Sequence, residues 1–314
     1  MRRIVAPAVL ALTALLVTAC GQAAAPVQQG VSVPLRIGTL QTDDLLPAWV
    51  AEQQQLFVNA GLNVTIQTFL SAQEQTAAIT AGQIDAIMTD MVVGLQLTAA
   101  GTPMRFVTIM QAAPAGVVAG ADTGITTAAD LAGVETGCAS PTILEYIYDR
   151  ALHEAGVPDD QIKTTEIKKL PVRLQMLTAG QIKAAVLPWT LYQLAISQGA
   201  VPVVDLAQSG PYTSTVLAVR QAWLDQADAV MTMQAVLAAW DLAVGVINAD
   251  PDAQRELLAA KANLPAPLDT TYPVRTYPTS GPPPTGQVQD VIDWMTAKGY
   301  LTSQVTVGDV IWQA

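Results

Sequence analysis

Short apolar stretches alternate with amphipathic ones along the chain from Leu35 onwards. The first part predicts strands at 35–39, 63–69, 85–88 and 105–110, separated by helices at 45–60, 74–81 and 91–100. A glycine follows each of these helices within a residue or so, where a left-handed helix cap favours it. Strands that alternate with helices are typical of βαβ units, so we expect an α/β fold with mainly parallel sheets.

The same order of elements then recurs. Strands are predicted at 135–138, 164–167, 183–187 and 201–204, with helices at 142–155, 172–179 and 191–197. Thr80-Ala81-Gly82-Gln83-Ile84 reappears as Thr178-Ala179-Gly180-Gln181-Ile182 at the corresponding place in the second round. We therefore expect two similar α/β lobes with a cleft between them.

Two glycine-bordered or β-rich segments, 116–120 and 215–219, are the natural crossings between the lobes, with hinges at 117–119 and 215–217. This places residues 35–116 and 217–314 in lobe 1, which is discontinuous in sequence, and residues 117–216 in lobe 2. A helical tail at 227–248 and 252–262 is expected to return to lobe 1. A proline-rich surface loop at 281–286 precedes a last helix at 287–298.

The N-terminus has the pattern of an export signal. Arg2 and Arg3 precede an apolar run at 4–17, and Val17-Thr18-Ala19 precede Cys20. A cysteine at this position resembles the bacterial lipoprotein signal, which implies removal of residues 1–19 and acylation of Cys20, for example with palmitate. Residues 20–34 then form a flexible tether. The alternative is an ordinary secretory signal. No later apolar stretch is long and uninterrupted enough to span a membrane, so lipid alone is the expected anchor.

Charge and the scarcity of cysteine and histidine exclude several classes of function. Without residues 1–19, thirteen basic residues face 26 acidic ones, and this net charge of −13 argues against binding nucleic acid. With Cys20 acylated, Cys138 has no disulfide partner, and we expect a buried thiol in preference to a nucleophile. His153 is the single histidine, so we expect no zinc or other metal site, no catalytic triad and no cofactor.

Several segments together resemble the solute-binding proteins of ABC importers with the type II periplasmic binding protein topology. The similarity is greatest to the group that binds nitrate, sulfonates, taurine and thiamine precursors. It is carried by Leu35–Gly38, Leu46–Glu52, Leu56-Phe57, Ala60–Val64, Ala81–Ala86, Asp130–Gly133 and Asp293-Trp294. The resemblance implies an extracytoplasmic monomer that is not an enzyme and that delivers a small solute to a permease with a cytoplasmic ATPase. The alternatives are an exported enzyme related to fungal pyrimidine-precursor synthases, whose cysteine-rich motif is missing here, and a ligand-sensing lipoprotein.

Ligands of open α/β sheets bind beyond the carboxyl ends of the strands, and four turns meet that description. Their candidate ligand-binding residues are Gln41, Thr42, Asp43, Thr89, Asp90, Ser140, Thr142 and Trp189. Each has a structural alternative: the aspartates, Ser140 or Thr142 as helix caps, and Trp189 as packing between helices. One of Asp43 and Asp44 is expected to face solvent.

The charges near these turns favour one ligand class over another. Asp43, Asp44 and Asp90 gather carboxylates on the lobe 1 side, while Lys168, Lys169 and Arg173 lie near a lobe 2 turn. Carboxylates repel a small anion and suit a ring that carries amine donors. We therefore favour a heterocyclic vitamin or pyrimidine precursor as the solute, with a sulfonate as the second choice.

Overall fold

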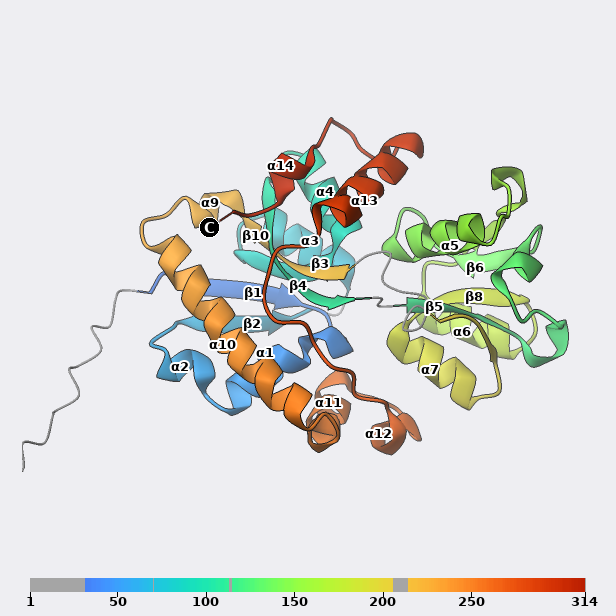
Figure 1. The fold of residues 1–314 in the computed structure, drawn as a ribbon, viewed down its shortest axis with the longest axis horizontal. Coiled ribbons are helices and arrows are strands. Elements are labelled where there is room, and N and C mark those ends of the chain that lie inside the picture. Colours follow the sequence, from blue (N-terminus) through green and yellow to red (C-terminus); the bar gives the residue numbers. More distant parts are fainter. Residues whose placement is uncertain (1–31, 70, 113–114, 206–213, 314) are drawn as a thin grey trace, which may run out of the picture. The chain divides into compact units, whose positions relative to one another are not determined.

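The computed structural model describes residues 32–69, 71–112, 115–205 and 214–313. The predicted signal at 1–19, the predicted acylation site Cys20 and most of the predicted tether lie outside the described residues. Within them, the chain forms two five-stranded sheets covered by helices (Figure 1). The two-lobe α/β architecture predicted from the sequence is confirmed.

Each sheet contains four strands of one direction and one strand that opposes them. The first sheet has the order β2-β1-β3-β10-β4, with β1 (Leu35–Thr39), β2 (Val64–Thr68), β3 (Ala86–Asp90), β4 (Met104–Ala112) and β10 (Ser214–Arg220). The second has the order β7-β6-β8-β5-β9, with β5 (Ala115–Ala119), β6 (Thr136–Cys138), β7 (Thr164–Glu166), β8 (Ala184–Pro188) and β9 (Val201–Asp205). β10 and β5 are the antiparallel strands.

The two segments expected to cross between lobes are these antiparallel strands. β5 pairs with β8 and β9 in the second sheet, and β10 pairs with β3 and β4 in the first. The chain thus passes between sheets after Ala112 and again after Asp205, and residues 113–114 and 206–213 are not described. Sheet membership assigns Ala115 and Gly116 to lobe 2 and residues 214–216 to lobe 1. The sequence pattern missed these positions because the extent of a strand depends on the strands that it pairs with, which the local pattern does not reveal.

Helices follow the strands largely as the periodicity predicts. Lobe 1 contains α1 (Leu46–Gln53), α2 (Leu56–Asn59), α3 (Ala72–Thr80) and α4 (Met91–Ala99), and lobe 2 contains α5 (Ile143–Glu154), α6 (Leu170–Thr178) and α7 (Trp189–Ser197). The helix predicted at 45–60 is broken, because Gln55 adopts a left-handed conformation with φ 56° within an exposed polar run. Gly82 and Gly180 of the repeated motif both have positive φ, 69° and 67°, so the two lobes end equivalent helices in the same way.

The C-terminal part packs on lobe 1. It contains α9 (Gln221–Leu224), α10 (Ala229–Ala249), α11 (Arg255–Ala262), α12 (Leu268–Thr271), α13 (Thr285–Ala297) and α14 (Val307–Val310). The proline-rich loop lies along β4, where Ile109 N donates to Gly281 O at 2.9 Å and Gly281 N donates to Thr108 Oγ1 at 3.0 Å. The loop thereby covers the edge of the first sheet.

Among the described residues, α10 is long and apolar enough to cross a membrane by length and composition. The prediction that no stretch after residue 19 could span a membrane is therefore wrong by length and composition. The helix carries Met233, Val236 and Trp240 on a face that is buried in the same hydrophobic cluster as Val50 of α1. We therefore describe α10 as a core helix of lobe 1.

Candidate functional site

A cavity of about 240 Å³ is lined by residues of both lobes. Its polar wall comes mainly from lobe 1 and contains Thr42, Asp43, Asp44, Thr89, Asp90, Gln111 and Thr215. Its apolar wall includes Leu40, Met88 and Val93 of lobe 1 and Ile143, Leu144, Leu170 and Trp189 of lobe 2. Most of the first group follows the carboxyl ends of β1 and β3, where ligands of open α/β sheets bind. A volume near the lower end of the range for ligand pockets suits a single substituted ring.

Five of the eight predicted site residues line this cavity: Thr42, Asp43, Thr89, Asp90 and Trp189. Gln41 is exposed and is not among the lining residues. Thr142 caps α5, since its hydroxyl accepts from Glu145 N at 3.3 Å and donates to Ala139 O at 2.6 Å. Ser140 N donates to Glu166 Oε2 at 3.0 Å. Neither Ser140 nor Thr142 lines the cavity, whose contribution from this turn comes from Ile143 and Leu144.

Three carboxyl groups gather on the lobe 1 wall. The expectation that Asp43 or Asp44 faces solvent is wrong, because both are only 7% exposed. Burial, together with the charge of Asp43, raises the pKa of Asp44 above its ordinary value, although Thr42 Oγ1 donates to Asp44 Oδ1 at 2.5 Å. Burial also raises the pKa of Asp90 to about 6, with a smaller contribution from Asp44. The wall therefore holds carboxyl groups that gain from a ligand carrying donors or positive charge.

The basic side chains near the site interact with other groups of the protein and do not line the cavity. Arg275 lies beside the cavity without lining it: Nη2 is 3.4 Å from Asp43 Oδ2, and the guanidinium lies 4.6 Å from the ring centre of Trp189. The buried guanidinium of Arg173 donates to Ile167 O and Val186 O, which makes it a structural residue. Lys168 is 78% exposed and lies near Glu166. Within the described part of the chain, no lysine, arginine or histidine lines the cavity.

Trp189 both packs and lines the cavity. It begins α7 directly after Pro188, and its ring stacks on Tyr192 with centroids 5.3 Å apart. The cation that lies over its ring is the chain's own Arg275. The structure therefore shows that Trp189 packs and lines the cavity, and its contact with a ligand stays a prediction.

Gln111 and Thr215 were missed by the sequence analysis, and Asp44 was left out of the predicted set. Gln111 lies one residue before the end of β4 and is 2% exposed. Among the described residues, neither its Nε2 nor its Oε1 has a hydrogen-bond partner. Thr215 lies on β10, and its hydroxyl is 3.5 Å from Gln111 O. Both residues are polar side chains at the end of a mainly apolar strand, and this pattern could have indicated them. The pattern does not show, however, which strands lie next to each other in the sheet.

Cys138 and His153 are of the residue types that act as nucleophiles or metal ligands in other proteins, and neither lines this cavity. Cys138 is buried in the core of lobe 2, and burial raises the pKa of its thiol to about 12. His153 Nε2 lies 2.5 Å from Asp159 Oδ1 at an exposed position. Among the described residues, no group of three or more histidine, cysteine, aspartate or glutamate side chains is placed to hold a metal ion.

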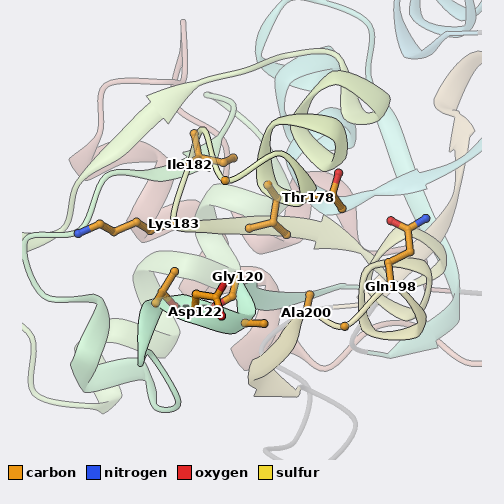
Figure 2. A pocket seen from close by; sticks show the side chains of 12 residues that line it. Gly120, Asp122, Thr178, Ile182, Lys183, Gln198 and Ala200 are labelled. Atoms are coloured by element: carbon orange, nitrogen blue, oxygen red, sulfur yellow. Dashed lines mark hydrogen bonds between the residues drawn. The ribbon is translucent and has the colours of Figure 1, made fainter.

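A second pocket, of about 220 Å³, lies at the other end of the second sheet (Figure 2). Its walls include Gly120, Asp122, Lys183, Gln198 and Ala200, at the amino ends of β8 and β9. All of its lining residues belong to lobe 2. A change in the arrangement of the lobes leaves such a pocket unaltered, so we assign the candidate ligand site to the cavity that both lobes line.

With its two five-stranded lobes and the cavity that both line, the chain has the fold of the periplasmic solute-binding proteins. Among solved structures, the periplasmic aliphatic sulphonate binding protein SsuA of Escherichia coli is 20% identical, with a TM-score of 0.76 over 89% of this chain and 92% of that one. The alkanesulfonate-binding protein SsuA of Xanthomonas axonopodis pv. citri, bound to MOPS, is 19% identical, with a TM-score of 0.74 over 90% and 98%. The nitrate-binding protein NrtA of Synechocystis PCC 6803 is 14% identical, with a TM-score of 0.68 over 90% and 86%.

The sequence itself matches the family described as NMT1/THI5 like over residues 43–253. This match covers more than half of the chain, so the chain belongs to the NMT1/THI5-like family. A comparison with curated proteins found no match.

Proposed function

We propose that this protein is the extracytoplasmic solute-binding component of an ABC importer and that it captures a small heterocycle, neutral or cationic, between its lobes. The observation that carries the ligand class is the charge of the cavity. Asp43, Asp44 and Asp90 line it, and no described lysine, arginine or histidine does. Carboxyl groups accept from ring N–H and amino groups, whereas the negative charge of a sulfonate or nitrate is repelled there.

Binding, as opposed to catalysis, is supported by the chemistry of the lining. It contains no cysteine, histidine, lysine or serine among the described residues. Because both lobes line the cavity, a ligand that contacts both stabilises their closed arrangement. A permease with a cytoplasmic ATPase is the proposed partner, and acylated Cys20 the proposed membrane anchor of a monomer.

The proposal is tested by thermal shift and calorimetry of the purified protein with two sets of compounds. One set contains aminopyrimidines and related amino-substituted rings, and the other contains the anions ethanesulfonate and nitrate. We expect rings of the first set to raise the melting temperature, since a ligand at 100 times its Kd adds about 2.7 kcal/mol to the free energy of unfolding.

The anion set is expected to leave the melting temperature unchanged. Binding of sulfonates without binding of the rings would contradict the ligand class and leave the transport role standing. The absence of binding to every compound in both sets would contradict the solute-binding function.

A further inference from the structure

Three polar side chains form a row across the first sheet at the cavity. Thr215 of β10 is the register partner of Asp90 on β3 and of Gln111 on β4. Directly opposed residues of antiparallel strands place their side chains on the same face of the sheet, a few ångströms apart. All three residues line the cavity. The row therefore presents a carboxylate, a hydroxyl and a carboxamide side by side to the same space.

Gln111 is the member of this row without a protein partner. It is buried, and neither polar atom of its carboxamide has a hydrogen-bond partner within the part of the chain that the structure describes. Gln75 of α3, in the same lobe, is a buried glutamine whose carboxamide does have hydrogen-bond partners. It is 1% exposed, and its Nε2 donates to Gly38 O at 3.0 Å and to Met88 O at 3.1 Å. A buried amide with no partner destabilises the free protein, and a partner that enters the cavity removes that cost.

We propose that Gln111 is a specificity-determining residue of the cavity. Its carboxamide forms two hydrogen bonds with an edge of the ligand that carries one donor beside one acceptor. This inference rests on the proposed solute-binding function and deepens it. A carboxamide offers an N–H donor and a C=O acceptor next to each other, so its bidentate partner is the edge of a cyclic amide or of an amino-substituted ring nitrogen. Asp90, at the other end of the row, accepts from a further N–H of the same ligand.

The position of Gln111 also relates this recognition to the crossing between lobes. Gln111 is followed by Ala112, the last residue of β4, after which the chain passes to lobe 2. Thr215 is the second residue of β10, the strand on which the chain returns. A ligand held by Gln111 and Thr215 therefore contacts both strands that lead to the crossings.

The first test compares two matched variants of the free protein, Gln111→Leu and Gln75→Leu, by urea unfolding. Both remove a buried carboxamide from lobe 1. We expect Gln111→Leu to unfold at the same urea concentration as the wild type or at a higher one, because no protein hydrogen bond is lost. Gln75→Leu should unfold at a clearly lower concentration, because two backbone carbonyl groups lose their donor. An equal loss in both variants would show that Gln111 has a structural partner and would overturn the inference.

The second test measures affinity for two sets of ring compounds by calorimetry. Each set contains a ring with the donor–acceptor edge and a methylated ring without the donor: 4-aminopyrimidine with 4-(dimethylamino)pyrimidine, and 2-pyridone with N-methyl-2-pyridone. The size control is 3-methyl-2-pyridone, which adds a methyl group and keeps the edge. We expect the wild type to bind at least one edge-bearing ring ~10-fold or more tightly than its methylated partner, and Gln111→Leu to lose this difference.

The outcomes separate this inference from the proposed function. If the wild type binds rings with and without the edge equally, and Gln111→Leu binds them as the wild type does, the role of Gln111 is refuted while solute binding stands. If the wild type binds sulfonates and none of these rings, the ligand lacks the edge and the inference is refuted. If the wild type binds none of the compounds in either experiment, the proposed function is refuted and the inference with it.

Discussion

Asp90 combines a structural and a site role in one side chain. It is the last residue of β3 and the N-cap of α4, where its extended backbone lets Oδ1 accept from Val93 N at 3.0 Å. It also lines the cavity, and its pKa is raised from 3.8 to about 6 by burial first and by Asp44 second. The sequence left capping and ligand contact as alternatives for this residue. The structure shows the cap and places the same carboxyl group at the cavity.

The raised pKa of Asp90 makes stability depend on pH. Folding favours the protonated form of Asp90. The contribution of Asp90 to the free energy of unfolding is therefore fully present below its unfolded pKa of about 4, and it is lost as the pH rises through about 6. The shift corresponds to about 3 kcal/mol. Asparagine keeps the capping oxygen and does not ionise. We therefore expect the melting temperature of Asp90→Asn, measured by calorimetry, to be higher than that of the wild type at pH 7 and equal to it at pH 4.

Asp130 provides a control of opposite sign for that measurement. Backbone hydrogen bonds from Thr126 and Thr127 lower the pKa of Asp130. The contribution of Asp130 to the free energy of unfolding is therefore present above its unfolded pKa and is lost as the pH falls through its folded pKa. Asp130→Asn should therefore lower the melting temperature at pH 7. An Asp90→Asn effect of equal size at pH 4 and pH 7 would show that ionisation of Asp90 is not its cause.

At the scale of elements, α13 of the C-terminal part contacts α5 of lobe 2. Lys298, at the C-cap of α13, places Nζ 2.7 Å from Asp149 Oδ2 and 3.4 Å from Glu145 Oε1. Trp294 Nε1 donates to Asp149 Oδ2 at 2.8 Å, and the Tyr300 hydroxyl donates to Glu145 Oε1 at 2.9 Å. Both carboxyl groups are buried, so this cluster joins the lobes through charges that depend on Lys298.

Replacing Lys298 with methionine keeps most of its aliphatic length and removes its charge. Two buried carboxylates then lack their cation, and we expect a loss of about 1–2 kcal/mol in urea unfolding at pH 7. This is less than for a fully buried pair, because Lys298 is 39% exposed. Lys168→Met, at an exposed ion pair, is the matched control and should cost much less. Equal losses in the two variants would argue against the cluster.

The same cluster predicts the behaviour of the protein at high pH. Burial alone would lower the pKa of Lys298, but the hydrogen bond and charge of Asp149 and the charge of Glu145 raise it above its ordinary value. The contribution of Lys298 to stability is therefore present below the unfolded pKa of about 10.4 and is lost as pH rises through the folded pKa.

At the scale of the whole molecule, two of the contacts that the C-terminal part of lobe 1 makes with lobe 2 involve a cation. One is the α13 cluster, and the other is Arg275, which pairs with Asp43 of lobe 1 and lies over Trp189 of lobe 2. Both contacts join side chains of this chain. We therefore expect them to stabilise the closed arrangement, to which a ligand then adds its own contacts.

Removal of both contacts should shift the free protein towards an open arrangement. We expect Arg275→Met/Lys298→Met to have a larger radius of gyration than the wild type in small-angle X-ray scattering without ligand, and a ligand to reduce the difference. Far-UV circular dichroism checks that the variant is folded. A folded variant whose radius of gyration equals that of the wild type would contradict this role of the two contacts.

Much of the fold was predictable because the interactions that define it are local in sequence. Apolar periodicity and glycine caps located most of the strands and helices, and the repeated Thr80–Ile84 motif indicated the second lobe. The break at Gln55 and the short helices α12 and α14 were missed, since they depend on a few residues and on packing against distant elements. The strand-end rule likewise indicated where Asp43, Thr89 and Trp189 lie.

The sequence by itself therefore determined the elements, the two lobes and the edges of the sheets at which a ligand site was to be sought. Only the tertiary structure decided which polar side chains meet there. Thr215 and Gln111 are 104 positions apart, and the register of β10 between β3 and β4 brings them into one row with Asp90. Register between distant strands is a property of sheet packing and not of local pattern, which is why the buried carboxamide of Gln111 became visible only in the folded chain.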